Sequence, residues 1–220
     1  MDIQLEPYAA DAVPVLEQAG AYSRWGKRCL DVALVLLSAP LVVPVIAIAA
    51  ALMALEGGQP FFWQARVGRG GQAFPMLKLR SMRRDAERYL QEIINTCPAS
   101  AAEWERSQKL RRDPRITPLG MILRKTSIDE LPQLWNVLVG HMSLVGPRPM
   151  MVSQSPLYPG SAYYRMRPGL TGPWQVFARN HRRFGARATY DSFYEEKRGL
   201  AYDVLVMCQT VRAVMRGTGQ

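Results

Sequence analysis

How this chain folds is decided first by one uncharged stretch, Val32-Ala-Leu-Val-Leu-Leu-Ser-Ala-Pro-Leu-Val-Val-Pro-Val-Ile-Ala-Ile-Ala-Ala-Ala-Leu-Met-Ala-Leu55. As a straight α-helix it would rise about 36 Å, which is enough to cross the hydrocarbon core of a bilayer. A signal peptide fits poorly because the preceding residues are acidic and the apolar stretch is too long. A buried core helix also fits poorly, since a helix that is apolar all round is rare in a small domain. We therefore expect residues 24–56 to form a membrane helix.

Both flanks of this stretch are cationic. Arg24, Lys27 and Arg28 precede it, and a further series of Arg and Lys follows it. Positive flanks favour the cytoplasm for both ends of the helix. Pro40 and Pro44 each remove a backbone donor and bend a helix. We predict a re-entrant helix that enters one leaflet, bends at these prolines and returns; a spanning helix is the alternative.

The charge is distributed unevenly along the chain, which carries +10 over 220 residues. Residues 1–23 contain acidic but no basic residues, and we expect them to be a flexible tail. The remainder is strongly basic, which points to phosphorylated substrates, anionic lipid or nucleic acid as partners. Three scattered cysteines make no disulfide framework, and two histidines argue against Ser-His catalysis and a histidine-rich metal site.

Downstream of the apolar stretch, the patterns predict an α+β domain that is mainly helical with a small β-hairpin. The hairpin is expected at Phe61–Val67 and Ala73–Arg80, around Gly68-Arg-Gly-Gly71. Helices are expected over 82–96, from Ser100 with Glu103 completing a capping box, over 131–138, and from Asp203 onward. A short strand at 142–145 and a turn region at 168–173 complete the prediction, and we expect amphipathic helices at the membrane interface.

Two adjacent carboxylates, Asp129 and Glu130, stand out because no acidic residue follows them until Asp191. One interpretation is a capping box from Ser127 to Glu130, although Pro132 favours a helix that starts nearer Leu131. Both acids then lie at a helix N-terminus, where backbone N–H groups favour the ionised carboxylate. An ionised Asp can attack phosphorus, and its neighbour can hold Mg²⁺ together with a phosphate.

The segment Gly146-Pro-Arg-Pro149 places Arg148 between two prolines. A backbone fixed in this way presents a preorganised guanidinium fork to phosphate oxygens, although a stiff turn with a solvated Arg is the alternative. Lys78 and Arg80 alternate as on one face of a strand. Residues 168–172 and 174–180 combine a flexible turn with polar and aromatic groups, as in a nucleotide-binding loop or a plain loop.

In this order, the motifs resemble those of the bacterial sugar transferase family, the small monotopic phosphoglycosyl transferases. The resemblance is carried by Lys27-Arg-x-x-Asp31, Pro44, Gln64-x-Arg-x-Gly68, Lys78-x-Arg-x-Met82, Asp113-Pro-Arg-Ile-Thr117, Leu123-Arg-Lys-Thr-Ser-x-Asp-Glu-Leu-Pro-Gln133, Asn136-Val-Leu, Met142-Ser-Leu-Val-Gly-Pro-Arg-Pro149, Arg167-Pro-Gly-x-Thr-Gly172, Gln175, Arg179, Asp191 and Tyr194. The chain departs from the family pattern at Val43-Pro44, where a Ser-Pro pair is usual, and at His141, where an acid is usual.

The resemblance implies an enzyme that moves a sugar-1-phosphate from a UDP-sugar to polyprenyl phosphate and releases UMP, with Asp129 as nucleophile and Glu130 holding Mg²⁺. It implies that residues 57–220 form a catalytic domain on the cytoplasmic face of the bacterial inner membrane. The partners that it implies are membrane phospholipid and a second copy of the chain in a homo-oligomer, and it implies no nucleic-acid partner. The residues expected to bind substrate or phosphate are Lys78, Arg80, Arg115, Arg124, Arg148, Arg167, Gln175 and Arg179.

Two other classes of protein compete with this interpretation. A membrane-tethered nucleic-acid binder would explain the net charge and would show a steep salt dependence, but it leaves Asp129 and Glu130 without a role. The other is a non-enzymatic scaffold of a polysaccharide-export complex. Release of UMP from UDP-sugars distinguishes the transferase from both.

Overall fold

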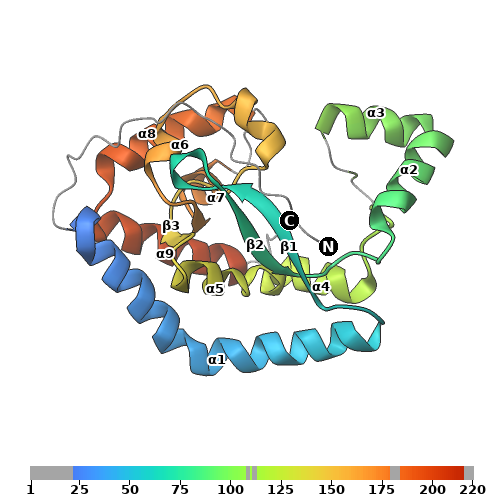
Figure 1. Cartoon of the computed structure of the whole chain (residues 1–220), viewed down its shortest axis with the longest axis horizontal. Coiled ribbons are helices and arrows are strands. Elements are labelled where there is room, and N and C mark those ends of the chain that lie inside the picture. Colours follow the sequence, from blue (N-terminus) through green and yellow to red (C-terminus); the bar gives the residue numbers. More distant parts are fainter. Residues whose placement is uncertain (1–21, 108–109, 111–112, 179–183, 216–220) are drawn as a thin grey trace.

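The computed structural model describes residues 22–107, 110, 113–178 and 184–215, so the predicted tail up to residue 21 and Arg179 lie outside the described residues. The described chain is mainly helical, with one antiparallel hairpin and one short pair of parallel strands. In Figure 1, a long bent helix runs along one side of the molecule, and the hairpin and most of the other helices form a body beside it. The predicted fold class is confirmed in this respect.

The apolar stretch lies within α1 (Lys27–Leu55), which continues a short π-helix, η1 (Tyr22–Gly26). Tyr22 and Ser23 are therefore helical, although the sequence assigned them to the tail. Pro40 and Pro44 lie inside α1, and Figure 1 shows the helix bending near its middle. By length and composition alone, the segment Tyr22–Leu55 could cross a membrane, because an 18-residue window within it has a mean hydropathy of 2.7.

One side of α1 packs on the rest of the protein along both halves of the helix. Val35 lies in a core cluster with Met76 and Val137, and Met53 lies in another with Leu79. The opposite side exposes large apolar side chains, namely Leu36, Leu37, Leu41, Val43, Ile48, Leu52 and Leu55. A helix with this division needs a second apolar environment, which a membrane provides.

The predicted hairpin forms from β1 (Phe61–Val67) and β2 (Ala73–Leu79), with η2 (Arg69–Gly71) in the turn. The strands are antiparallel, and their register pairs Phe62 with Lys78 and Arg66 with Phe74. Gly70 has φ 73°, which favours glycine in this turn. The expected second strand is one residue too long, because Arg80 leaves the ladder.

Two helices form an arm that projects from the body (Figure 1): α2 (Ala86–Thr96) and α3 (Pro98–Ser107). The expected start of α2 at Met82 is wrong, because Met82 pairs with Ile116 in an isolated β-bridge. The helix α3 begins at Pro98, so Ser100 lies inside it and not at its N-cap.

The second half of the chain supplies the remaining elements. They are α4 (Pro118–Thr126), η3 (Ile128–Glu130), α5 (Gln133–Leu138), β3 (Ser143–Val145), η4 (Val152–Leu157), α6 (Ala162–Arg165), β4 (Gly169–Thr171), α7 (Pro173–Phe177), η5 (Phe184–Ala186), α8 (Arg187–Lys197) and α9 (Leu200–Met215). The strand β3 is as expected, but the expected turn at 168–173 contains β4, which pairs with β3 in parallel. A Cβ at Gly172 would lie 1.9 Å from the Gly146 carbonyl oxygen, so glycine permits this close approach.

The last helix is tied to the first by a buried carboxylate. Asp203 accepts hydrogen bonds from the Tyr22 hydroxyl, the Lys27 ammonium and the Tyr194 hydroxyl, each at 2.6 Å. The sequence predicted that Asp203 caps this helix. The prediction is wrong, because α9 begins at Leu200 and Asp203 lies in its first turn. The start of α1 is thereby fixed to α8 and α9.

Candidate active site

The two acids lie in a tight turn between α4 and α5. Thr117 caps α4, its side chain accepting a hydrogen bond from the Gly120 N–H at 2.9 Å. The helix ends at Ser127, which has the left-handed φ of 58°. Asp129 and Glu130 occupy the 3₁₀ turn that follows, and Pro132 stands at the N-cap of α5. The proposed capping box from Ser127 is therefore wrong, because Ser127 ends one helix and its side chain caps neither.

Asp129 is 8% exposed. Its burial and the negative charge of Glu130 raise its pKa to about 6, although Lys78 and Arg124 oppose the shift. A backbone N–H group favours the carboxylate of Asp129, as expected, but desolvation is the larger effect and raises the pKa. The carboxylate is still the main form at neutral pH, and it is more basic than that of an exposed Asp.

Glu130 has the opposite electrostatic environment. Its carboxylate accepts a hydrogen bond from the Lys78 ammonium at 2.9 Å. Burial alone would raise the pKa of Glu130, but the positive charges of Lys78 and Arg148 outweigh it and lower the pKa. Two adjacent acids with pKa values moved in opposite directions are typical of a catalytic pair.

A pocket opens beside Glu130. Three cations face it from separate parts of the chain: Arg66 on β1, Lys78 on β2 and Arg148 in the loop after β3. The full lining is Arg66, Met76, Lys78, Glu130, Gln133, Arg148, Pro149, Leu170 and Gln175. Three positive charges against one carboxylate suit an anionic ligand with several oxygens, such as a diphosphate.

Of the residues expected to bind substrate, Lys78, Arg148 and Gln175 meet in this pocket. Arg124 is not in the pocket lining; its charge acts to lower the pKa of Asp129, and its Nε donates to Ser81 Oγ at 2.8 Å. The three lining residues come from distant parts of the sequence, and the fold brings them together beside Glu130.

The structure gives three other expected residues protein partners outside the pocket lining. Arg80 donates to the carbonyls of Met53 and Gly57 at the end of α1, at 3.1 and 2.6 Å. Arg115 binds Asp113 through two nitrogens, and Arg167 donates to the Gly140 carbonyl at 2.9 Å. The expectation that Lys78 and Arg80 share one face of a strand is wrong, because β2 ends between them.

Three residues that the sequence did not select also belong to this region. Arg66 and Gln133 line the pocket, and Arg187 donates to the main-chain carbonyl of Arg148. Burial and the charge of Arg148 lower the pKa of Arg66 to about 10, so it stays positive at neutral pH. The hairpin register was a usable signal for Arg66, because it places Arg66 on the same face as Lys78. No spacing distinguished Arg187 from other arginines.

The residues present fit a magnesium ion shared with a phosphorylated substrate. The described residues contain no group of three or more acidic, histidine or cysteine side chains that could hold a metal alone. Mg²⁺ commonly binds through one or two carboxylates, waters and substrate phosphates. Glu130, ionised and at the pocket, has the donor chemistry that such a site requires.

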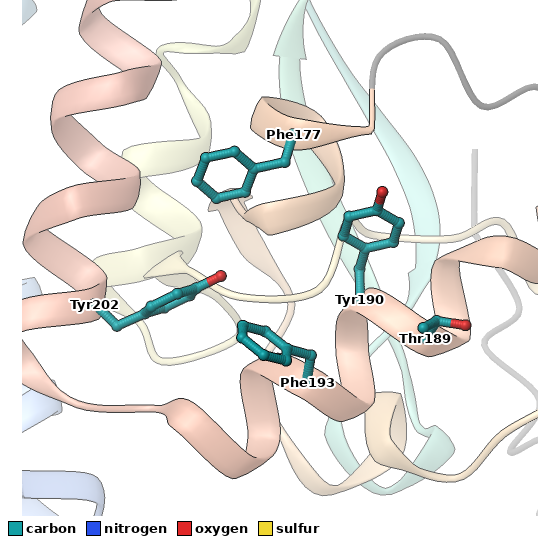
Figure 2. A pocket seen from close by; sticks show the side chains of 5 residues that line it. All are labelled: Phe177, Thr189, Tyr190, Phe193 and Tyr202. Atoms are coloured by element: carbon teal, nitrogen blue, oxygen red, sulfur yellow. The ribbon is translucent and has the colours of Figure 1, made fainter.

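A second pocket, of about 330 Å³, lies on another side of α7. Figure 2 shows Phe177, Phe193 and Tyr202 around it, with Tyr190 and Thr189 from α8. None of these five residues is charged, so this lining offers no positive charge to a phosphate. Phe177 is two positions after Gln175, which lines the pocket beside Glu130, so α7 separates the two pockets.

The model of the family described as bacterial sugar transferase matches residues 22–217. Over 217 residues the chain is 38% identical to the exopolysaccharide production protein ExoY of Sinorhizobium fredii, and the match covers 96% of each protein. It is 41% identical to the UDP-galactose-lipid carrier transferase of Erwinia amylovora over 90% of this chain. It is 40% identical to the undecaprenyl-phosphate galactose phosphotransferase of Salmonella typhimurium, also over 90% of this chain. The chain spans 42% of the length of each of these last two relatives. These matches show that the chain belongs to the bacterial sugar transferase family.

Proposed function

We propose that the protein transfers a sugar-1-phosphate from a UDP-sugar to polyprenyl phosphate, such as undecaprenyl phosphate, and releases UMP. This step would begin exopolysaccharide or other glycoconjugate synthesis. The observation that carries the proposal is the pair of acids with opposite pKa shifts beside three cations. The family assignment supports it, since relatives are named for galactose phosphate transfer, undecaprenyl phosphate and exopolysaccharide production.

Asp129 would act as the nucleophile. Its carboxylate oxygen attacks the phosphorus that bears the sugar, and the bond from that phosphorus to the bridging oxygen breaks. UMP departs with the electron pair, leaving the sugar phosphate esterified to Asp129. An oxygen of polyprenyl phosphate then attacks the same phosphorus and restores the carboxylate. Burial supports this role, because a poorly solvated carboxylate with a raised pKa is a stronger nucleophile than an exposed one.

The cations would stabilise the charge that moves during both steps. Arg66, Lys78 and Arg148 face the space beside Glu130, where a diphosphate would lie. Fixed donors around a transferring phosphoryl group supply much of the catalysis in such reactions. Glu130 would hold Mg²⁺ together with the substrate phosphates, and a bound Mg²⁺ neutralises phosphate charge.

We further propose that α1 enters and leaves the membrane on one face, the cytoplasmic face of the inner membrane. Its two ends contact one body of protein. At its start Arg28 donates to the carbonyls of Val137 and Leu138, and at its end Arg80 donates to the carbonyl of Met53. A helix that crossed the bilayer would place its ends on opposite sides, where one domain could not hold both.

Transfer can be tested with the full-length protein in lipid nanodiscs. UDP-galactose, undecaprenyl phosphate and Mg²⁺ serve as probes, and UMP release is measured across a panel of UDP-sugars. Without the lipid acceptor, a mass increase of one sugar phosphate is expected on the peptide that contains Asp129. No UMP release with any UDP-sugar would overturn the transferase proposal.

Topology can be tested separately with a single reporter cysteine at position 10, after replacement of Cys29, Cys97 and Cys208. An impermeant thiol reagent is applied to cells whose outer membrane alone is permeabilised. Protection until the inner membrane is lysed supports re-entry, whereas labelling from outside shows a spanning helix. A cysteine placed at Glu56, in the turn after α1, reports the other end of the helix.

A further inference from the structure

The loop that carries Arg148 has few main-chain hydrogen-bond donors of its own. Pro147 and Pro149 have no N–H group. Main-chain hydrogen bonds hold the ends of the segment, where the Gly169 N–H donates to the Pro147 carbonyl and the Val67 N–H donates to the Met150 carbonyl. The two carbonyl groups between these ends accept from guanidinium groups. Arg66 donates to the Pro149 carbonyl at 3.4 Å, and Arg187 donates to the Arg148 carbonyl. The side chain of Arg148 extends from this segment to the pocket beside Glu130.

We propose that Arg187 is a positioning residue for Arg148: it holds the Arg148 main chain from behind, so that the Arg148 guanidinium faces the pocket. Arg148 would contact the substrate phosphate, whereas Arg187 would act only through Arg148. This inference rests on the proposed function for the claim that Arg148 binds phosphate.

The burial of Arg187 supports this role. Arg187 is 5% exposed, and its Nε has no hydrogen-bond partner among the described residues. A guanidinium buried in this way is costly, and an ordinary core position would take an apolar side chain instead. Its hydrogen bond to the Arg148 carbonyl and its position 4.9 Å over the Phe184 ring are the contacts that hold it.

The neighbouring carboxylate of Asp191 does not compete with the Arg148 carbonyl for the Arg187 guanidinium. Asp191 lies one helical turn further along α8 and is 1% exposed. It accepts a hydrogen bond from the Tyr158 hydroxyl at 2.9 Å, while its charge offsets that of Arg187 at longer range. The charge of Asp191 thus stabilises the buried Arg187 guanidinium, whose N–H groups remain able to donate to the Arg148 carbonyl.

The first test measures the loop itself and needs no turnover. Hydrogen–deuterium exchange of peptides covering 145–151 is compared between wild type and Arg187→Met in nanodiscs. The Met150 amide, which donates to the Tyr163 hydroxyl at 3.3 Å, should exchange about tenfold faster in the variant, with global melting retained. Arg165→Met is the matched control, because Arg165 also lies against α8 but pairs with Glu195. The control should exchange as wild type does, and an Arg187→Met loop that also does so would overturn the proposal.

If Arg187→Met does not fold, Arg187→Lys replaces it. Lysine keeps the charge but has one nitrogen in place of the three of the guanidinium group, so its loop should exchange faster than that of wild type. Unchanged exchange in Arg187→Lys alongside unchanged kcat would overturn the proposal.

The second test separates positioning from a general effect on the fold. With UDP-galactose as probe, Arg187→Met should lower kcat/KM about tenfold in the wild-type background. In an Arg148→Ala background the same change should cost less than about twofold, because the residue through which Arg187 acts is absent. Losses that multiply in the double variant would show that Arg187 acts elsewhere. Failure of all transfer would count against the proposed function alone, and the exchange result would still decide on Arg187.

Discussion

The cations at the start of α1 and those around the acid turn have the same composition but opposite surroundings. Lys27 and Arg28 are bound by protein groups, the carboxylate of Asp203 and the end of α5. In the pocket, Lys78 and Arg148 share one carboxylate, Glu130, with Arg66 as a further positive charge. The first region is closed and stabilises the fold, whereas the second lines a pocket with three positive charges and one carboxylate, which suits an anionic ligand.

The largest effect is expected from Asp129→Asn. Transfer should fall about 10⁴-fold or more, as expected when a nucleophile is removed. The same variant should be more stable at pH 7 by about 1–3 kcal/mol, because the folded protein holds a carboxylate whose pKa is raised from 3.8 to about 6. That carboxylate contributes stability below pH 4 that is lost as pH rises through 6. UMP release and thermal melting measure both effects, and near-normal turnover would remove Asp129 from the mechanism.

The opposite result is expected from Asp203→Asn at the closed region. Lys27 would lose its charged partner in a nearly buried position, and the fold should lose about 3 kcal/mol. Glu196→Gln makes the same chemical change in an exposed pair with Lys197 and should alter stability by less than about 1 kcal/mol. Thermal unfolding in nanodiscs compares the two. Equal losses would mean that the two regions do not differ as described.

A smaller change separates two arginines that look alike in the sequence. Arg148→Lys keeps the charge but loses the fork, so kcat/KM should fall about 10–100-fold with little effect on melting. Arg115→Lys should instead lower the melting temperature, because Arg115 binds Asp113 through two nitrogens and stacks over Trp104. An Arg115→Lys protein with a normal melting temperature and poor turnover would show that Arg115 takes part in catalysis and not mainly in stability.

The smallest effect is the pH dependence of wild type. Since Asp129 must be ionised to attack, kcat/KM should rise with pH through about 6 and level off by about pH 7. Initial rates of UMP release between pH 5 and 8 measure the profile. A rate already maximal at pH 5 would show that the attacking group has an ordinary, low pKa.

Local patterns predicted the hairpin, the strand after α5 and the long apolar helix, because each rests on neighbouring residues. They failed where distant segments decide the outcome. The strand β4 exists because β3 pairs with it, and Asp203 lies inside α9 because Tyr22, Lys27 and Tyr194 occupy its carboxylate.

The candidate site divides in the same way. The acid pair and Arg148 had local signals, whereas the pairing of Lys78 with Glu130, 52 positions apart, did not. Charge and propensity give no indication which arginine finds a protein partner. For the same reason the raised pKa of Asp129 was missed, since burial depends on the packed fold and not on the neighbouring sequence.

The contact between Asp203 and the residues before α1 has a consequence for the order in which the protein matures. Tyr22 and Lys27 lie 181 and 176 positions before the carboxylate that binds them. During synthesis, α1 leaves the ribosome long before α9 exists, so its start can already be held by the contact of Arg28 with the end of α5 before Asp203 is made. The contact of Asp203 with Tyr22 and Lys27 is therefore a late step, and a chain that stops before residue 203 would carry the whole acid turn but lack this second anchor at the start of α1.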